Sequence, residues 1–449
     1  MDWSRRHFIT RSTATALAAA LPFDPAAAEA ARPAAFRDLV LICNEDSNTL
    51  SVIDPVTNAV HGTINLTSFD EDPREPFRLA AGGMHATPLY HGAIGLHGAS
   101  PSPDNRLLAC TGRGSSNLYL IDLESLKVVG CCPNPQAGEQ TNAVRLSSGI
   151  LVGREPHGPA FTRNAREIWV CLRGEDRIAI VDTTAALREC NGVPAGAVRS
   201  YMNSLNGPAQ VSFSRDGRLA FVTSHKTAAF EVVEPCTGAD GCSRPQRRTL
   251  VNIQEHDPHG FTAFQKLSPD GRELWLSHKL ADGLTVWSAT LEPKLMDAIP
   301  LSLNARPNQV EFVDNAGGQV AYVSQARVEE MATGATPSSR IAIIDRTAPQ
   351  GQRVVTGSFP SHGREAHGLW TNPERTRLYV AHGQEGLADT PAAGQAVCSV
   401  FDVQDPYSPQ FLNQIPLGDL PLPSGRLRNK RSAELVYVRT GGSRRTIPT

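Results

Sequence analysis

Residues 367–382 read HGLWTNPERTRLYVAH, and this stretch decides the fold. A His-Gly pair opens a short apolar segment, Asn372-Pro373-Glu374-Arg375 marks a turn, and residues 378–382 are strand-forming. A further strand over residues 397–402 ends in Phe-Asp. The stretch therefore predicts a unit of short antiparallel strands joined by tight turns.

The same pattern recurs along the chain about every fifty residues. The other copies begin at His97-Gly98, His157-Gly158, Asn206-Gly207, His259-Gly260 and Arg306-Pro307. Turns such as Ser268-Pro269-Asp270-Gly271 follow each start, and a second strand comes after each turn. A repeat of this length built from short strands is typical of a ring of β-sheet blades.

The two ends of the chain complete one another in this pattern. Residues 39–44 and 49–54 match the second and third strands of a unit that lacks its first strand, and residues 434–438 form a lone strand after the last unit. Pairing them would remove two exposed sheet edges. We therefore predict an all-β, seven-bladed β-propeller over residues 31–440, closed by a C-terminal strand in the first blade, with a tail at 441–449.

Residues 1–30 have the features of an export signal. Arg5 and Arg6 precede a short apolar run over residues 14–21, and Ala28-Glu29-Ala30 is a small-x-small cleavage site. The run is too short to span a bilayer. We predict a twin-arginine signal peptide, a periplasmic location and no membrane span.

Composition limits the partners and the thiol chemistry. The chain has 43 basic and 45 acidic residues, so no net field attracts nucleic acid. Nine cysteines make disulfides admissible in an exported protein. Cys236 and Cys242 flank two glycines and predict a small stapled loop, whereas the pairing of Cys131, Cys132 and Cys190 stays open.

The repeat units resemble a known propeller family. Residues 41–44 with 52–54, and Ser268-Pro269-Asp270-Gly271-Arg272, are similar to the Tyr-Val-Thr-Asn (YVTN) β-propeller repeat. That group includes YncE-like periplasmic proteins, lactonase-type propellers and the haem propeller of cytochrome nitrite reductase. The resemblance covers residues 38–440 and implies the fold. It does not imply one function, because the fold hosts lyases, lactonases, haem and quinone enzymes and binding proteins.

Histidines gather at one predicted face of the ring. In a propeller the start of the innermost strand and the end of the second strand lie at the same mouth of the central channel. Histidines occupy both places, and imidazole clusters suit copper, iron or zinc. The predicted metal ligands are His97, His157, His259, His278, His367 and His382, and the predicted cofactor-binding residues are Asn206 and Arg306.

Three functional hypotheses stay open at this point. The first is a copper, zinc or iron/haem site with a redox or binding role at the channel mouth. The second is a YncE-like binding module, for a small-molecule ligand or a periplasmic protein partner, in which the His-Gly pairs serve the repeat. The third is a lactonase- or lyase-like enzyme with a histidine beside Glu155 or Glu365 as base. No Cys-x-x-Cys-His or phosphate loop is present.

Overall fold

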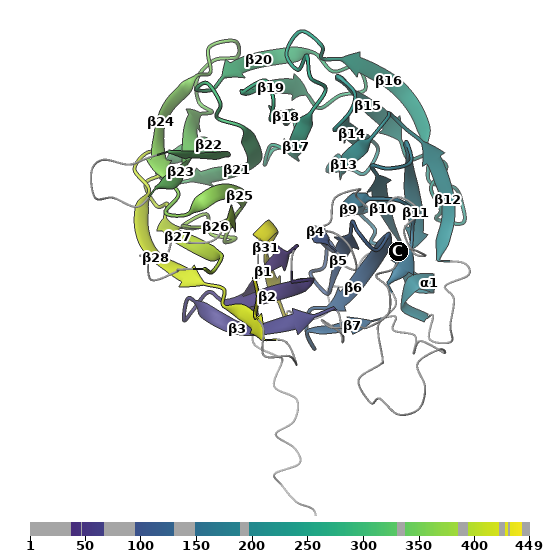
Figure 1. Cartoon of the computed structure of the whole chain (residues 1–449). Coiled ribbons are helices and arrows are strands. Elements are labelled where there is room, and N and C mark those ends of the chain that lie inside the picture. Colours follow the sequence, from purple (N-terminus) through teal and green to yellow (C-terminus); the bar gives the residue numbers. More distant parts are fainter. Residues whose placement is uncertain are drawn as a thin grey trace, which may run out of the picture.

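The computed structural model describes residues 37–45, 47–66, 95–129, 149–188, 197–329, 337–384, 394–421, 427–429 and 432–441. The predicted signal at 1–30, the tail beyond residue 441 and Cys131, Cys132 and Cys190 lie outside the described residues. The described part forms a ring of seven β-sheet blades around a central axis (Figure 1). The prediction of a seven-bladed propeller is therefore confirmed.

Each blade is an antiparallel sheet whose innermost strand lines the axis. From the inside outward, blade 1 contains β31 (Ser432–Thr440), β1 (Arg37–Asn44), β2 (Thr49–Asp54) and β3 (Ala59–Asn65). Blade 2 contains β4 (Leu96–Pro101), β5 (Leu107–Gly112), β6 (Asn117–Asp122) and β7 (Lys127–Val129), with β8 (Ile150–Leu151) also paired to β6. Blade 3 contains β9 (Pro156–Phe161), β10 (Glu167–Leu172), β11 (Arg177–Asp182) and β12 (Val198–Asn203), and α1 (Thr183–Arg188) follows β11.

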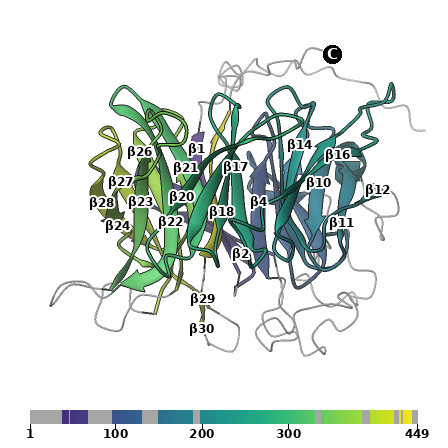
Figure 2. The ribbon, with the colours of Figure 1, turned by 90° about the horizontal axis from the view of Figure 1, so that it is seen from above.

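The remaining blades repeat this order. Blade 4 contains β13 (Pro208–Phe213), β14 (Ala220–Ser224), β15 (Ala229–Glu234) and β16 (Gln246–Asn252), and blade 5 contains β17 (Thr262–Leu267), β18 (Glu273–His278), β19 (Gly283–Ser288) and β20 (Leu295–Pro300). Blade 6 contains β21 (Pro307–Asn315), β22 (Gly318–Glu329), β23 (Ser338–Asp345) and β24 (Val355–Pro360). Blade 7 contains β25 (Arg364–Thr371), β26 (Arg377–Gln384), β27 (Val397–Asp402) and β28 (Gln410–Pro416), and a separate hairpin joins β29 (Asp419–Pro421) to β30 (Leu427–Asn429). The hairpin projects from one face of the ring (Figure 2).

The C-terminal strand closes the ring as predicted. Strand β31 pairs with β1 in an antiparallel register that places Leu41 opposite Val436. The first blade is thereby built from both ends of the chain, with β31 and β1 side by side (Figure 1). This pairing removes the open edges that an incomplete first blade would expose.

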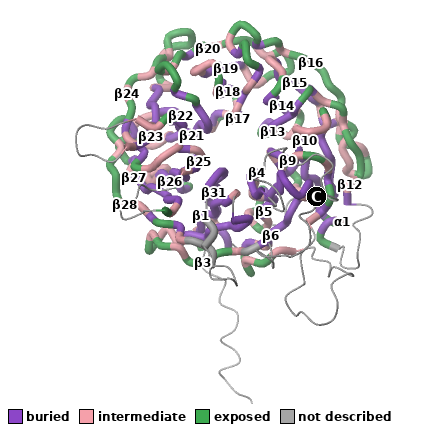
Figure 3. Tube along the Cα trace, in the orientation of Figure 1, coloured by how far each residue is buried: buried purple, intermediate pink, exposed green. Residues whose placement is uncertain are grey.

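The core lies between the blades. Side chains of alternating strand positions pack face to face, as in the cluster that joins Trp169 and Val222 of neighbouring blades. The buried residues lie mainly in the inner strands of the blades, and the exposed residues follow the rim and loops (Figure 3). Burial of this kind fixes the register of each strand, because a shift by one residue would turn its apolar side outward.

The described cysteines are all free thiols, so the predicted staple between Cys236 and Cys242 is absent. Backbone hydrogen bonds close that loop instead: Gly238 N donates to Cys242 O at 2.8 Å and Arg244 N donates to Pro235 O at 2.8 Å. The turn therefore holds its shape without a covalent link. No helix in the described part has the length and apolarity needed to cross a membrane.

Candidate functional site

A β-bulge in the innermost strand of every blade builds the channel mouth. In blade 3, Pro156 pairs with Leu172 and Pro159 with Val170, so two residues, His157 and Gly158, face a single residue of β10. The same shift occurs in the other six blades. By this register the first bulge residues are His97, His157, Ala209, Ala263, Asn308, His367 and Ala433, and the second are Gly98, Gly158, Gln210, Phe264, Gln309, Gly368 and Glu434.

The glycine of each His-Gly bulge is required by the next blade. A Cβ on Gly98 would overlap the carbonyl oxygen of His157, and one on Gly158 would lie 2.7 Å from the carbonyl oxygen of Ala209. Thr111 links the two neighbouring blades at Gly98. Its hydroxyl accepts a hydrogen bond from Gly98 N at 3.0 Å and donates one to His157 O at 2.6 Å. The His-Gly pair therefore serves the repeat, while its histidine remains available to the channel.

A second ring of residues comes from the second strand of each blade, one position after the residue that pairs with the innermost strand just before its bulge. By the same register this position is occupied by Glu45, Arg113, Arg173, His225, Lys279, Ala326 and Gly383. All of these except Ala326 line a cavity of about 270 Å³, together with His97, His157 and His367 of the bulge ring. We call this cavity the histidine chamber.

Four imidazoles lie side by side in the histidine chamber. The ring centroids of His97 and His157 are 4.3 Å apart, those of His157 and His225 are 4.6 Å apart, and those of His97 and His367 are 6.0 Å apart. The ring of Phe261 stacks on His225 at 4.3 Å. The chain of rings thus spans blades 2, 3, 4 and 7.

Two carboxylates hold the guanidinium groups at the chamber wall. Arg113 Nη2 lies 2.7 Å from Glu45 Oε1, and Arg173 Nε lies 3.1 Å from Glu155 Oε2. The third cation, Lys279 Nζ, donates to Asn308 Oδ1 at 2.7 Å. These contacts fix the positive groups in place before any ligand arrives.

Burial, followed by the neighbouring imidazoles and these cations, lowers the pKa of the four histidines. Burial lowers the pKa of His97 and His157 well below the ordinary value, and Arg113 and Arg173 lower both further. The pKa of His225 is lowered in the same way, by burial and then by Arg173. Burial and Lys279 lower the pKa of His367 to about 3. Arg113, Arg173 and Lys279 thus place positive charge close to the rings, while Glu45, Glu365 and Glu434 also line the chamber.

Three of the imidazoles keep an unused nitrogen. The Nδ1 atoms of His97, His225 and His367 are buried and have no hydrogen-bond partner among the described residues. The exposed fractions of His97 and His225 are only 7% and 9%. By contrast, His157 Nδ1 lies 3.0 Å from Ala209 O. Buried polar atoms without a partner are costly, so these three nitrogens point to a ligand or to water in the chamber.

Three of the residues predicted from the sequence lie elsewhere at this face. His259, Asn206 and Arg306 are exposed and do not line the chamber. Gly207, Gly260 and Arg306 have φ of 68°, 62° and 51°, so these residues form left-handed turns before the innermost strands start. The comparison of repeat units placed these three predicted residues at the bulges, but the bulge positions are occupied by Ala209, Ala263 and Asn308. The pairs at 206–207 and 259–260 resemble His97-Gly98 in sequence but not in backbone conformation.

His278 and His382 are committed to the protein. His278 is 1% exposed; its Nε2 lies 2.8 Å from Thr285 Oγ1, and its Nδ1 lies 3.3 Å from Asp257 Oδ2. Trp287 Nε1 donates to the same Thr285 hydroxyl at 2.8 Å. His382 contacts Val397 O and the Ser361 hydroxyl at 3.1 Å and 3.0 Å. Both rings therefore join strands within their blades.

The six predicted metal ligands are thus not brought together. His97, His157 and His367 are neighbours, but no group of three or more His, Cys, Asp or Glu side chains in the described part of the chain is placed to hold a metal ion. The charges of Arg113, Arg173 and Lys279 also oppose a cation close to these rings. The described residues thus do not place a metal site, and copper, iron/haem or zinc binding by His97, His157 and His367 stays a prediction.

Sequence reasoning missed the cations of the chamber. Arg113, Arg173 and Lys279 follow the second strands of three units, in the same repeat position as His225. A comparison of the units at that one position would have found them. The prediction from the sequence relied on the histidines and not on the basic residues at this repeat position.

Comparisons with known proteins show the fold alone. No protein-family model and no curated protein matches the chain. Among solved structures, a putative 6-phosphogluconolactonase from Bacteroides uniformis has a TM-score of 0.57 at 13% identity, covering 90% of this chain and 100% of that one. A functionally unknown protein from Desulfotomaculum acetoxidans has a TM-score of 0.56 at 10% identity, covering 89% and 98%. Hydrazine synthase from Kuenenia stuttgartiensis has a TM-score of 0.51 at 14% identity, covering 80% and 99%.

Proposed function

We propose that this propeller binds a small anionic ligand in the histidine chamber. The observation that carries the proposal is the grouping of Arg113, Arg173 and Lys279 around four adjacent imidazoles in one cavity. An anion would interact favourably with these three cations. It would also meet preorganised donors, because the guanidinium groups are already held by Glu45 and Glu155.

The residues divide the work of recognition. The guanidinium groups of Arg113 and Arg173 and the ammonium group of Lys279 supply charge-assisted hydrogen bonds to a carboxylate, phosphate or sulfate group. Once these rings take up a proton, the Nδ1 atoms of His97, His225 and His367 donate further hydrogen bonds to the anion. A bound anion would raise the pKa of these rings, so affinity increases as the pH falls and protons are taken up on binding.

Isothermal titration calorimetry with acetate, phosphate and sulfate at fixed ionic strength tests this proposal. Arg113→Gln and Lys279→Gln should each weaken binding at least about tenfold, corresponding to the loss of about 1.4 kcal/mol of binding free energy. The matched control is Arg154→Gln, which removes an exposed arginine outside the chamber lining. Absence of binding by every anion, or equal weakening by the control, would refute the proposal.

The competing metal hypothesis rests on the short distances between the rings of His97, His157 and His367. Elemental analysis for copper, iron and zinc, with a visible spectrum, separates it from anion binding. Stoichiometric metal in the wild-type protein that is lost in His157→Ala would favour it. Lactone turnover, by contrast, would favour the enzyme hypothesis.

The location in the periplasm is also part of the proposal. It is supported by Arg5 and Arg6, followed by a short apolar run. Replacing both arginines by lysine should leave the protein in the cytoplasm, as measured by cell fractionation. Unchanged export of the double variant would show that a different route is used.

A further inference from the structure

A second cavity continues the channel beyond the histidine chamber. It measures about 360 Å³ and shares four lining residues with the first cavity: His157, Gln210, Phe264 and Glu434. These four residues come from blades 3, 4, 5 and 1, so they surround the axis where the two cavities meet. The two cavities therefore lie end to end.

The second cavity differs in chemistry from the first. Much of its wall is apolar or aromatic, and we call it the apolar chamber. Its apolar lining includes Pro101, Pro159, Phe161, Phe213, Leu267 and Trp370. Surfaces of this kind bind hydrocarbon or aromatic groups, because such contacts release water from apolar area.

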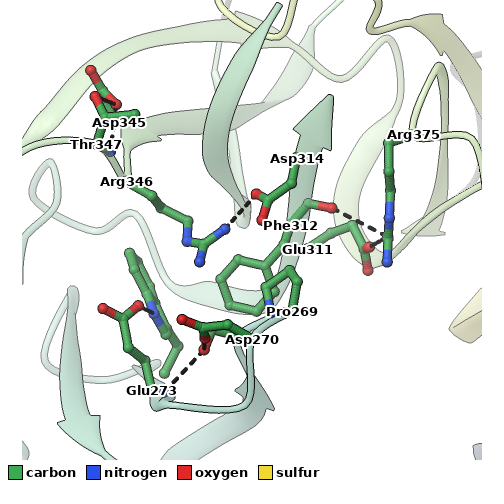
Figure 4. Close-up of polar contacts among 12 residues, drawn as sticks. Pro269, Asp270, Glu273, Glu311, Phe312, Asp314, Asp345, Arg346, Thr347 and Arg375 are labelled. Carbon is green, nitrogen blue, oxygen red and sulfur yellow. Dashed lines mark hydrogen bonds and ion pairs between the residues drawn. The ribbon is translucent and has the colours of Figure 1, made fainter. Parts of the chain in front are cut away.

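The cations of the apolar chamber are already engaged by the protein. Lys266 Nζ lies 4.3 Å from the ring centroid of Trp370 and forms an ion pair with Glu311. Glu311 also accepts a hydrogen bond from Arg375 at 2.6 Å (Figure 4). Arg163 donates to the carbonyl oxygens of Phe213 and Ser214 at 2.8 Å and 3.0 Å. Little net charge is therefore offered to a ligand in this chamber.

The junction between the two chambers is built from both polar and apolar side chains. Glu434 Oε1 accepts from Gln309 Nε2 at 2.5 Å, and Gln210 Oε1 accepts from Gln265 N at 3.3 Å. Phe264 adds an apolar surface to both chambers. A ligand molecule that is polar at one end and apolar at the other would match this order of the two chambers.

Resting on the proposed function, we propose that the ligand is an amphipathic anion. Its charged head lies in the histidine chamber among Arg113, Arg173 and Lys279, and its apolar tail passes Phe264 to lie in the apolar chamber near Trp370. The ligand class is therefore an alkyl or aryl carboxylate, or a phosphate or sulfate ester of similar shape.

A chain-length series tests this inference. Calorimetric titration with linear carboxylates from acetate to decanoate, below their micelle concentrations, should show affinity rising about two- to fourfold per added methylene group until the apolar chamber is filled. The matched alcohols lack the charged head and should bind at least about tenfold more weakly. Ser212→Leu, which narrows the apolar chamber, should remove the length dependence and leave acetate binding unchanged.

A spectroscopic readout covers the case in which the narrowing variant fails to fold. Octanoate should change the fluorescence of the wild-type protein, and Trp370→Phe should remove that change, because the other described tryptophans are buried between blades. Acetate binding without any dependence on chain length would overturn the inference and leave the proposed function standing. Failure of every anion to bind would overturn the proposed function itself. Alcohols that bind as tightly as the carboxylates would overturn both.

Discussion

At the scale of the residue, one step along a strand separates structural side chains from those of the candidate site. His278 ends β18, and its two ring nitrogens contact Thr285 and Asp257. The next residue, Lys279, lines the histidine chamber. Glu434 combines both roles, because it is almost fully buried and also lines both chambers. Its burial changes the pKa of its carboxyl group.

The ionisation of Glu434 should destabilise the fold as the pH rises. Burial raises its pKa from the ordinary 4.5 to about 7. Between these two values the folded state holds a proton that the unfolded chain releases, so stability is lost as the pH rises through this window. Glu434→Gln should remove up to about 3 kcal/mol of the difference in unfolding free energy between pH 5 and pH 8.

Urea unfolding of both proteins at the two pH values measures this effect. Glu124→Gln, on an exposed carboxylate, is the control and should keep the wild-type pH dependence. An identical pH dependence for Glu434→Gln and the wild type would show that the carboxyl group is not protonated in the folded state.

At the scale of the element, the bulge in each innermost strand sets the spacing between neighbouring blades. Gly98 and Gly158 bring one strand against the backbone of the next, and Gly368 does the same, because a Cβ there would lie 2.8 Å from Leu435 N. The other four blades carry larger residues at this position, which line the channel instead. Three blades thus contribute a histidine to the channel, followed by a glycine that contacts the next blade. The other four blades contribute the side chain of the second bulge residue.

Gly98→Ala should destabilise the protein by about 1–3 kcal/mol, because the added methyl group would push blade 2 away from His157 O. The control is Gly62→Ala in β3, where no atom lies within 4 Å of the new Cβ. The control should be neutral or slightly stabilising. Guanidinium unfolding midpoints compare the variants, and equal midpoints would contradict the role of the bulge.

At the scale of the whole molecule, the ring depends on a joint between the two ends of the chain. Arg439 of β31 forms an ion pair at 2.6 Å with Asp38 of β1 and another at 2.6 Å with Glu374 of blade 7. Tyr437 also donates to Asp38 at 2.6 Å. The hydrogen bond from Arg439 lowers the pKa of Asp38, so this stabilisation is present at neutral pH and is lost as the pH falls below the ordinary range of an aspartate.

Arg439→Gln should therefore lower stability by about 1 kcal/mol at pH 7, since the pair is partly exposed, and by less at pH 3. Thermal and chemical unfolding at both pH values would measure the change. Arg218→Gln removes an exposed arginine 3.7 Å from Asp216 and should have no measurable effect. A loss that is the same at both pH values would exclude the ion pair as its cause.

The sequence by itself determined the ring. Turns such as residues 268–271, and strands such as residues 378–382, are local features that each unit repeats, so their number and order could be read directly. The lone strand at residues 434–438 could be assigned to the first blade because an unpaired edge is unfavourable.

Only the tertiary structure decided the membership of the site. His97, His157 and His367 were found from the sequence because each lies in a His-Gly bulge, but His259-Gly260 has the same letters and belongs to a turn. The histidine chamber also joins Glu45 to Glu434 across nearly the whole chain. Its composition depends on the bulge register of seven strands and on the lengths of the turns before them, which tertiary packing selects and a local pattern does not encode.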